Sequence, residues 1–444
     1  HHTFTLMESI SDKHSRILRH HKATLDQVVT SMKTFSLKLD TTQLPNKIYL
    51  LAVGKASQQM LEAFSRSYSV RIIDGMVLSP DPIPTEKVDK NIHKLSFFTG
   101  THPLPSEENE ASTLEILSFI KSLPAGATLV SLISGGTSSL LCLPPDPISI
   151  ADLQHTYDVL LRSGASIHEM NTVRKHISLV KGGQLAQFAH HLHLRTYLLS
   201  DVPQDTAHVI GSGPTLTDPS TYEQALDILN AYNLKEQIPK SVREYLEQGA
   251  LGRYPETPKP GLNDHPDQEV HLITVSKTLQ PFLQSLLEQQ GFGVHWSDAP
   301  IQGNQKTIVR EIAGQIISVL NGQSELSQKA PQALVFQGES YLEVKGEGTG
   351  GRNQHLALLL ALSLEGHHPV SVLSLATDGV DGPTDAAGAL VSSYTTLHAR
   401  KQGHLPEPYI QQYNSYAFHE VMNTLIKTGP SGTNLMDLCV VLIR

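Results

Sequence analysis

The amino-acid sequence predicts an α/β protein of two domains, each a mostly parallel or mixed sheet covered by helices in three layers. Three observations support this fold class. Apolar strand segments alternate with amphipathic helical segments, polar loops that contain glycine follow directly after strands, and 444 residues with 39% hydrophobic side chains suffice for two cores. Ligands of such open sheets bind at the carboxyl ends of the strands, so we expect the functional residues to lie there.

The alternation begins near residue 47 and continues towards residue 443. The strand segments are short apolar runs bounded by glycine, proline or polar residues, and the helical segments repeat apolar residues every three or four positions. The predicted strands span residues 47–53, 75–78, 95–98, 128–133, 196–199, 270–275, 294–297, 333–336, 341–344, 371–376 and 438–443. The predicted helices include residues 107–121, 149–161, 279–290, 307–320 and 355–362.

The domain boundary is predicted within residues 249–268, which contain four prolines and no apolar period. We therefore expect an N-terminal domain over residues 7–255 and a C-terminal domain over residues 256–444. Residues 1–6, which precede Met7, resemble the remnant of an expression tag and are left out of the fold prediction.

The composition restricts the class of partner. Lys and Arg number 34 against 43 Asp and Glu, a net charge of -9, which disfavours a nucleic-acid partner but leaves small anionic substrates open. Cys142 and Cys439 both lie in apolar runs, so we expect buried free thiols and no disulfide. No apolar run approaches the roughly 20 residues of a membrane span. We therefore expect a soluble, cytoplasmic protein with no membrane partner.

Lys55 and a glycine-rich run lie in two of the loops that follow strands. Lys55 comes where a helix should begin, and a positive charge there opposes the helix dipole unless an anion is bound. A surface lysine on the first helical turn is the alternative. The second loop offers two glycines and three hydroxyls, which can surround an anion or form only a polar turn. Its predicted cradle consists of Ser134, Gly135, Gly136, Thr137 and Ser138.

Four charged residues lie near other strand ends or on a helix. Arg174 and Lys175, within a predicted helix, can bind an anionic substrate or can form part of a solvated face. Asp201 and Asp378 each follow a buried strand and precede a turn. A carboxylate at that place suits a Mg²⁺ ion or the acceptance of a proton, and the capping of a following helix is the alternative.

A run of glycines from Gly346 to Gly351 matches G-x-G-x-x-G between a predicted strand and a predicted helix. Such a loop can present backbone N–H groups to a dinucleotide or to a transferable phosphate, or it can form only a tight turn. A dinucleotide site needs an acidic residue roughly 20 residues later for the ribose. Here Asp378 follows 26 residues after Arg352, in a turn with its own glycines. A guanidinium at the end of the loop suits a phosphoryl group that is neutralised during transfer, so Arg352 favours a kinase.

Several short motifs occur in a fixed order, and together they cover nearly everything from about residue 8 to the C-terminus. They are Gly54-Lys55-Ala56, Thr101-His102-Pro103, Ser134-Gly135-Gly136, Val173-Arg174-Lys175-His176, Lys181-Gly182-Gly183, Ser200-Asp201-Val202, Gly211-Ser212-Gly213-Pro214-Thr215, Gly350-Gly351-Arg352-Asn353-Gln354, Thr377-Asp378-Gly379, the run from Asp381 to Gly388, and the run from Lys427 to Asn434. In this order the chain resembles the class II glycerate kinases, also called the MOFRL family.

The resemblance implies ATP-dependent phosphorylation of D-glycerate, at the 2-hydroxyl, with Mg²⁺ and release of ADP. It implies a site in a cleft between two α/β domains, with essential roles for Lys55, Asp201, Arg352 and Asp378. We assign phosphate charge to Lys55 and Arg352, and Mg²⁺ to Asp378 and Asp201, although Asp201 can instead orient or deprotonate the hydroxyl. The Ser134–Ser138 cradle, with Arg174 or Lys175, is assigned to phosphate or to the glycerate carboxylate. Nucleotide binding is assigned to Gly348, Gly350, Gly351, Asn353 and Gly379.

Two other functions remain open from the sequence. A nicotinamide-dependent hydroxypyruvate reductase would use the G-x-G-x-x-G match. A non-catalytic nucleotide or anion sensor would bind without turnover, but the pairing of two aspartates with two cations is more than binding requires. We expect small-molecule partners, D-glycerate and ATP, and a chain that can form a homodimer.

Overall fold

The computed structural model describes residues 10–35, 37–68, 71–82, 92, 94–200, 207–298, 301–328, 331–342, 344–367, 369–430 and 436–443. The chain divides into two compact units, one of Leu37–Val275 and one of His1–Ser36 together with Ser276–Arg444. We call them the middle unit and the split unit. Each contains a sheet with helices packed on it, which confirms the predicted α/β class.

The division differs from the predicted domains of residues 7–255 and 256–444. Strand β6 (Gln268–Thr274) lies beyond the expected boundary, yet it pairs in parallel with β5 (His193–Ser200) and extends the sheet of the middle unit. Helix α1 (Ile10–Thr34) comes first in the chain but packs on β10 (Val370–Ala376), β11 (Gly388–Ser392) and α13 (Thr395–Lys401) of the split unit. Backbone pairing and helix packing set the units, and composition alone does not reveal them.

The sheet of the middle unit has six strands in the order β3-β2-β1-β4-β5-β6, and every pairing is parallel. Its central strand β4 is buried at every position, as expected for an apolar run covered on both faces. The carboxyl ends of the strands therefore meet at one edge. The other strands are β1 (Lys47–Val53), β2 (Arg71–Ser79) and β3 (Ser96–Thr99), and β4 is Thr128–Ile133.

The helices of the middle unit include a cluster with its own core. Tyr157, Val173, Leu229 and Leu246 belong to that core. Ser166 begins α6 with a capping box to Glu169, which satisfies N–H groups of the first turn. The cluster consists of α5 (Ile150–Arg162), α6 (Ile167–His176), α8 (Tyr222–Ala231) and α9 (Lys240–Ala250), and the other helical segments are α2 (Ser57–Ser67), α3 (Glu107–Ser122), α4 (Thr137–Leu140), α7 (Gln184–Phe188) and η2 (Ile210–Ser212).

The sheet of the split unit is mixed, in the order β12-β11-β10-β13-β9-β7, with β8 also beside β9. The last strand, β13 (Asp437–Ile443), lies between β9 (Gln332–Tyr341) and β10 (Val370–Ala376) and runs antiparallel to both. The sequence predicts two strands here, at residues 333–336 and 341–344. The structure instead has the single strand β9, which ends at Tyr341. The remaining strands are β7 (Gly293–Trp296), β8 (Ile301–Asn304), β11 (Gly388–Ser392) and β12 (Leu425–Ile426).

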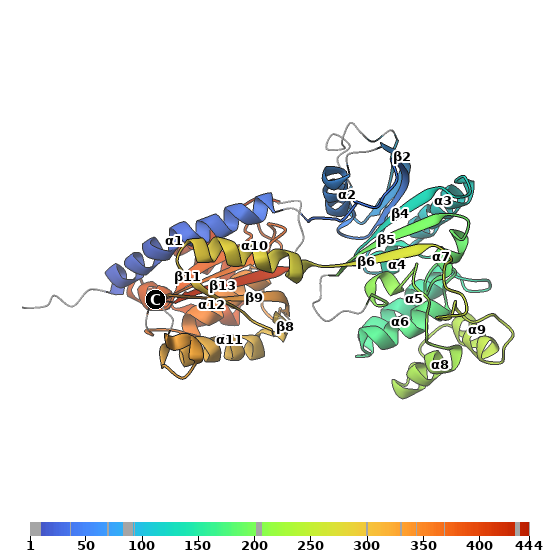
Figure 1. Cartoon of the computed structure of the whole chain (residues 1–444). Helices are drawn as coiled ribbons and strands as arrows, with labels where there is room; N and C mark the ends of the chain where they lie inside the picture. The colour runs from blue at the N-terminus through green and yellow to red at the C-terminus, as the bar shows by residue number, and fades with distance from the viewer. Residues whose placement is uncertain are drawn as a thin grey trace, which may run out of the picture. The chain divides into compact units, whose positions relative to one another are not determined.

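Helices cover both faces of this second sheet. Helices α11 (Gln305–Leu320) and α12 (Arg352–Ser363) bury one face, where Ile312, Leu360 and Val441 share a core. Helices α1 and α10 (Val275–Gln289) lie side by side on the other face (Figure 1). The remaining helical segments are η3 (Glu325–Gln328), α13 (Thr395–Lys401), α14 (Pro406–Gln411) and α15 (Ser415–Val421).

Two expectations from the sequence concern the cysteines and the presence of membrane-spanning helices. Cys142 and Cys439 are buried and free, as the sequence predicts. Within the described part of the chain, no helix combines the length and the apolarity needed to cross a bilayer.

Buried histidines fix helix α1 to its sheet. His14 Nδ1 lies 2.9 Å from the Ser392 hydroxyl, and His21 Nδ1 lies 2.8 Å from the Ser371 hydroxyl. The pKa of both rings is lowered to about 4 by burial, with an added contribution from His398 in the case of His14. Both rings are therefore neutral in the folded split unit at pH 7.

Acid is expected to weaken the split unit through these rings. An unfolded histidine titrates near 6.5, so the stability that a neutral His21 contributes is complete above that pH and is lost as the pH falls towards 4. Between pH 7 and pH 5, the free energy of unfolding of the variant His21→Gln should fall by about 2 kcal/mol less than that of the wild type. Urea unfolding at several pH values measures the difference, with His367→Gln as control. Parallel pH profiles for His21→Gln and the wild type would contradict the assignment.

Candidate functional site

The loops after β1 and β4 interlock at the carboxyl edge of the middle sheet. The Ala56 N–H donates to the Ser134 hydroxyl at 3.1 Å, and the Lys55 N–H donates to the Gly135 carbonyl at 2.8 Å. Gly54 has a φ of 123°, and a Cβ on it would lie 2.2 Å from the Ser134 hydroxyl oxygen. Only glycine permits this approach, so Lys55 is held next to the predicted cradle.

The five cradle residues divide into two groups. Ser134 and Thr137 are buried, and the Thr137 hydroxyl lies 3.0 Å from the Val53 carbonyl and 2.8 Å from the Ser134 carbonyl, so these side chains hold the loop together. Gly135, Gly136 and Ser138 are partly exposed. The second group forms the surface that a ligand can reach.

Lys55 and His102 both lie against Gly136. A Cβ on Gly136 would lie 3.0 Å from Cγ of Lys55 and 3.2 Å from Cδ2 of His102. The pKa of His102 is lowered to about 4, mostly by burial and in part by the charges of Lys55 and Arg174. Both cations therefore lie within electrostatic range of His102 at this edge.

Arg174 on α6 is a buried cation with which no carboxylate of the described residues forms an ion pair. It is 5% exposed, its guanidinium carbon lies 4.6 Å from the ring centre of Tyr157, and its Nε is buried with no hydrogen-bond partner. Burial lowers its pKa, and Tyr157 opposes the shift. Among the described residues, no acidic side chain pairs with Arg174 or with Lys55. A buried guanidinium is costly without an anion, so this edge suits an anionic ligand.

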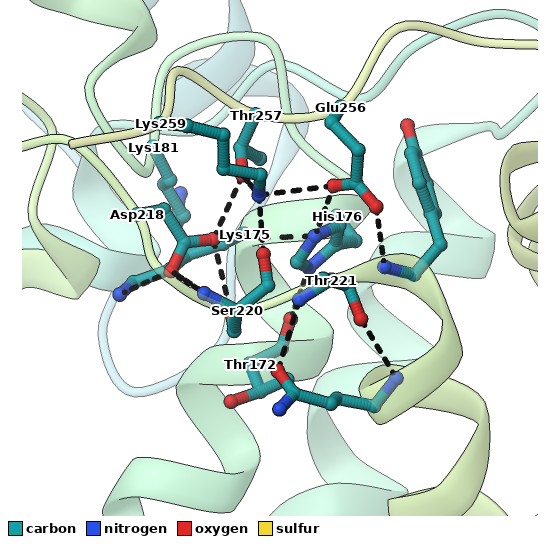
Figure 2. A network of polar contacts seen from close by, with 12 residues as sticks. Thr172, Lys175, His176, Lys181, Asp218, Ser220, Thr221, Glu256, Thr257 and Lys259 are labelled. Carbon is teal, nitrogen blue, oxygen red and sulfur yellow. Dashed lines mark hydrogen bonds and ion pairs between the residues drawn. The ribbon is translucent and has the colours of Figure 1, made fainter. Parts of the chain in front are cut away.

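Lys175 has a different environment, although it is the next residue. Its Nζ lies 3.2 Å from the buried carboxylate of Asp218. Figure 2 shows this Asp218 network, in which α6, the segment before α8 and the segment after α9 meet. Lys175 is thus engaged inside the unit, and the geometry favours Arg174 over it as a ligand for substrate. The other members include His176, Ser220, Glu256, Thr257 and Lys259.

Lys181 is a cation to which the sequence analysis assigned no role. It is 1% exposed, and its Nζ donates to the Leu141 carbonyl at 2.6 Å, just after α4. Burial lowers its pKa to about 8, with a contribution from Arg174. Its Lys-Gly-Gly motif was the available signal, but only the fold shows that the ammonium is buried against the carbonyl that ends α4. Asp201, by contrast, lies outside the described residues, and its role stays a prediction.

The glycine-rich run of the split unit packs against the chain before and inside α15. The Gly348 N–H donates to the Gln412 carbonyl at 2.8 Å, and the Thr349 N–H donates to the side chain of Asn414 at 3.2 Å. A Cβ on Gly350 would lie 2.2 Å from the Ser415 hydroxyl oxygen. Close packing explains these glycines, and the N–H groups of Gly348 and Thr349 are already bonded within the chain.

The start of α12 is capped by a side chain. Asp381 is 1% exposed and accepts the backbone N–H groups of Asn353 at 3.0 Å and Gln354 at 2.8 Å. Asn353 is buried, and its side chain bonds to Asp381 and Ser374. A Cβ on Gly351 would lie 2.2 Å from Cγ of Asp381. The carboxylate therefore occupies the place that a phosphate would take at a free helix start.

Gly379 also serves the packing of its loop. Its φ is 87°, and an added Cβ would lie 2.1 Å from the Gly429 carbonyl oxygen. The nucleotide-binding assignments for Gly348, Gly350, Gly351, Asn353 and Gly379 remain predictions, and the contacts within the chain give these residues a structural role in addition.

Arg352 is the first residue of α12 and turns towards two carboxylates. Its Nε donates to Asp437 at 2.5 Å, and its Nη2 donates to Asp437 at 3.0 Å and to Glu339 at 2.5 Å. The sequence does not single out Asp437, because the predicted last strand begins at Leu438. The only signal was a lone acid at the head of an apolar strand.

Asp378 lies near this arginine and is half-buried. Burial raises the pKa of its carboxyl group, the Val380 N–H at 3.0 Å and Arg352 lower it, and Glu339 raises it again. Within the described residues, no three His, Cys, Asp or Glu side chains are arranged to hold a metal. Mg²⁺ in phosphoryl-transfer sites often takes one or two carboxylates together with phosphate oxygens, so Asp378 fits such a partial site.

Comparisons with known proteins agree with the ordered motifs. Residues 12–247 match a domain described as a domain of unknown function, DUF4147, and residues 332–437 match the MOFRL family. A D-glycerate 2-kinase of Thermotoga maritima is 36% identical over 90% of this chain and 91% of its own. A protein of Agrobacterium vitis named putative hydroxypyruvate reductase is 33% identical over 89% of this chain and 86% of its own.

A solved structure matches the same extent of chain. The crystal structure of a glycerate kinase from Thermotoga maritima has a TM-score of 0.82 and 34% identity, and the match covers 96% of this chain and all of that one, 100%. The matched domains, the relatives and the shared fold thus cover nearly the whole length. The chain belongs to the MOFRL family, the class II glycerate kinases.

Proposed function

We propose that the protein transfers the γ-phosphoryl group of ATP to D-glycerate, at its 2-hydroxyl, and releases ADP. The observation that carries the proposal is the group of cations at the edge of the middle sheet, Lys55 and buried Arg174, which have no carboxylate partner among the described residues. An anionic substrate would supply the missing charge. The printed names of the relatives point to the same reaction.

The roles of the residues follow from their surroundings. Arg174 would bind the glycerate carboxylate, because a carboxylate matches the fork of a guanidinium and fills its unpaired N–H groups. Lys55 and Arg352 would offset the charge of the phosphates during transfer, where positioning and charge neutralisation do most of the catalytic work. Asp201 stays the predicted acceptor of the hydroxyl proton, or a metal ligand.

Mg²⁺ is the expected metal of the reaction. When bound, it would neutralise charge on the phosphate oxygens, and Asp378 is the residue proposed to hold it. A homodimer also stays a prediction, which sedimentation would test.

Hydroxypyruvate reduction is the second candidate, because the relative from Agrobacterium vitis carries that name. A reductase would need the glycine-rich run to face a dinucleotide pyrophosphate. In the structure the N–H groups of Gly348, Asn353 and Gln354 are bonded within the chain, which argues against that use. The kinase remains the better-supported proposal.

Two assays on one preparation decide between the candidates. We expect ADP release with ATP, Mg²⁺ and D-glycerate, and no NADH or NADPH oxidation with hydroxypyruvate. Phosphorus NMR of the product identifies the phosphorylated hydroxyl. Reductase activity without ADP release would overturn the proposal, and saturable ATP binding without turnover would favour a sensor.

The variant Arg174→Met tests the carboxylate site itself. We expect the KM for D-glycerate to rise at least about tenfold while the KM for ATP stays near that of the wild type. Methionine replaces an unpaired buried cation with an apolar side chain of similar length, so the melting temperature should hold or rise. Arg253→Met, at an exposed loop position, is the control. An unchanged KM for glycerate would remove Arg174 from the site.

A further inference from the structure

The guanidinium of Arg352 is held unequally by its two acids. Asp437 takes the edge formed by Nε and Nη2, with distances of 2.5 Å and 3.0 Å to its two oxygens. Its side chain is 3% exposed, and its backbone pairs with Gly338 on one side and Ala376 on the other. A buried, two-pronged carboxylate in the middle of a sheet fixes the plane of the guanidinium.

Glu339 is attached far more weakly. It bonds Nη2 of Arg352 at 2.5 Å, but its side chain is 54% exposed. Exposed ion pairs contribute little stability, because water competes for both charges and the long side chains lose freedom. In the described part of the chain, no acceptor bonds Nη1 of Arg352. The outer edge of the guanidinium is therefore open except where Glu339 touches it.

We propose that Asp437 orients Arg352 and that Glu339 occupies the place of an incoming phosphate oxygen, which it leaves when the phosphate binds. The inference rests on the proposed function insofar as Arg352 meets the phosphates of ATP. Asp437 is in this sense a positioning residue, since it acts through Arg352. Glu339 is an internal competitor, because its carboxylate and a phosphate oxygen cannot bond the same N–H group at full strength.

The charges nearby agree with this arrangement. Glu339 raises the pKa of Asp378, so the two acids repel each other beside the arginine. A polyphosphate that reached Nη1 while Glu339 stayed in place would meet the same repulsion. This repulsion is relieved when the exposed side chain of Glu339 moves away from the guanidinium.

Two matched acid-to-amide variants test the proposal by opposite effects. The probes are ATP without metal and inorganic tripolyphosphate, titrated calorimetrically at constant ionic strength. Glu339→Gln should bind both about threefold to tenfold more tightly than the wild type, and Asp437→Asn about tenfold more weakly. Glu311→Gln, an exposed position on α11, removes the same net charge and should change neither affinity by more than about twofold.

A readout without ligand separates orientation from simple stability. The protein is labelled with ¹⁵N-arginine, and the chemical shift of the Arg352 Nε–H group is compared with that of the wild type. It should be unchanged in Glu339→Gln and should move in Asp437→Asn. The proposal that a phosphate oxygen takes the place of Glu339 is overturned if Glu339→Gln binds the two probes no more tightly than the wild type. It is also overturned if the wild type binds neither probe. That variant changes only an exposed side chain, so it is decisive even if Asp437→Asn does not fold. A wild type that binds ATP but does not phosphorylate glycerate would refute the proposed function and leave this inference standing.

Discussion

Arg352→Ala is expected to lower turnover with ATP and D-glycerate at least about a hundredfold, which corresponds to about 2.7 kcal/mol of transition-state stabilisation. No acceptor among the described residues bonds Nη1 of the guanidinium, while Asp437 holds the edge formed by Nε and Nη2. In phosphoryl transfer, charge spreads over several oxygens, and a cation held in place stabilises that charge without reorganising. Alanine removes both the charge and the orientation.

The fold should survive this substitution. Burial already raises the pKa of Asp437 to about 7, against the opposing effect of Arg352. Without the arginine that pKa rises further, so Asp437 becomes a neutral acid at pH 7 and leaves no buried charge behind. We therefore expect a melting temperature within a few degrees of the wild type, checked by circular dichroism beside the turnover assay.

Two further variants sharpen the result. Arg352→Lys keeps a charge but not the fork, so it should recover only part of the lost turnover. Arg162→Ala removes an arginine whose side chain is 78% exposed on α5 and should leave turnover unchanged. Near-normal turnover in Arg352→Ala would eliminate the assigned role.

The ordered motifs sufficed to predict the family and the placing of polar loops after parallel strands. Local patterns carry this information, because a strand that ends in glycine and hydroxyl residues forms the same kind of loop in any open sheet. Lys55, Gly136 and Ser138 accordingly lie at one edge, where the sequence predicted them.

The choice between Arg174 and Lys175 could not be made from the sequence. Both are cations on the same helix, and successive residues point in directions about 100° apart. Their partners decide the matter, and those partners are distant in the chain: Asp218 pairs with Lys175, while Tyr157 stacks on Arg174. No local spacing encodes either contact.

The glycine-rich run illustrates the same limit. Its spacing is equally suited to a ligand or to close packing of two backbone segments. The contacts with Gln412, Asn414 and Asp381 reveal the packing, and they join residues 28 or more positions apart. Asp437 was missed for a related reason, since its importance lies in the arginine that it holds.

The segment predicted as a linker, residues 249–268, is joined to the middle unit by side-chain bonds, which composition does not report. Glu256 bonds His176 at 3.0 Å, Thr257 bonds Asp218 at 2.9 Å, and the Asp218 N–H donates to the Pro258 carbonyl at 2.7 Å. The proline-rich segment is thereby attached to α6 and to the start of α8, inside the middle unit (Figure 2).

Asp218→Ala is expected to be the most destabilising change in this network, by about 3–5 kcal/mol, or about 10 °C in the melting of the middle unit. Asp218 is fully buried, and it accepts bonds from Lys175, Ser220 and Thr257. Burial opposes its ionisation, but Lys175 and the Ser220 hydroxyl outweigh burial and hold its pKa below the usual value. Alanine would leave Lys175 in the interior without an anion.

A double variant distinguishes the loss of the pair from general damage. Adding Lys175→Met to Asp218→Ala removes the stranded ammonium and should recover part of the lost stability, because an apolar replacement often costs less than an unpaired charge. Asp158→Ala, which breaks the exposed pair with Arg162, should cost less than about 0.5 kcal/mol. A loss below about 1 kcal/mol in Asp218→Ala would show that the network contributes little. If the double variant also keeps its KM for D-glycerate, Lys175 is structural and does not bind the glycerate carboxylate.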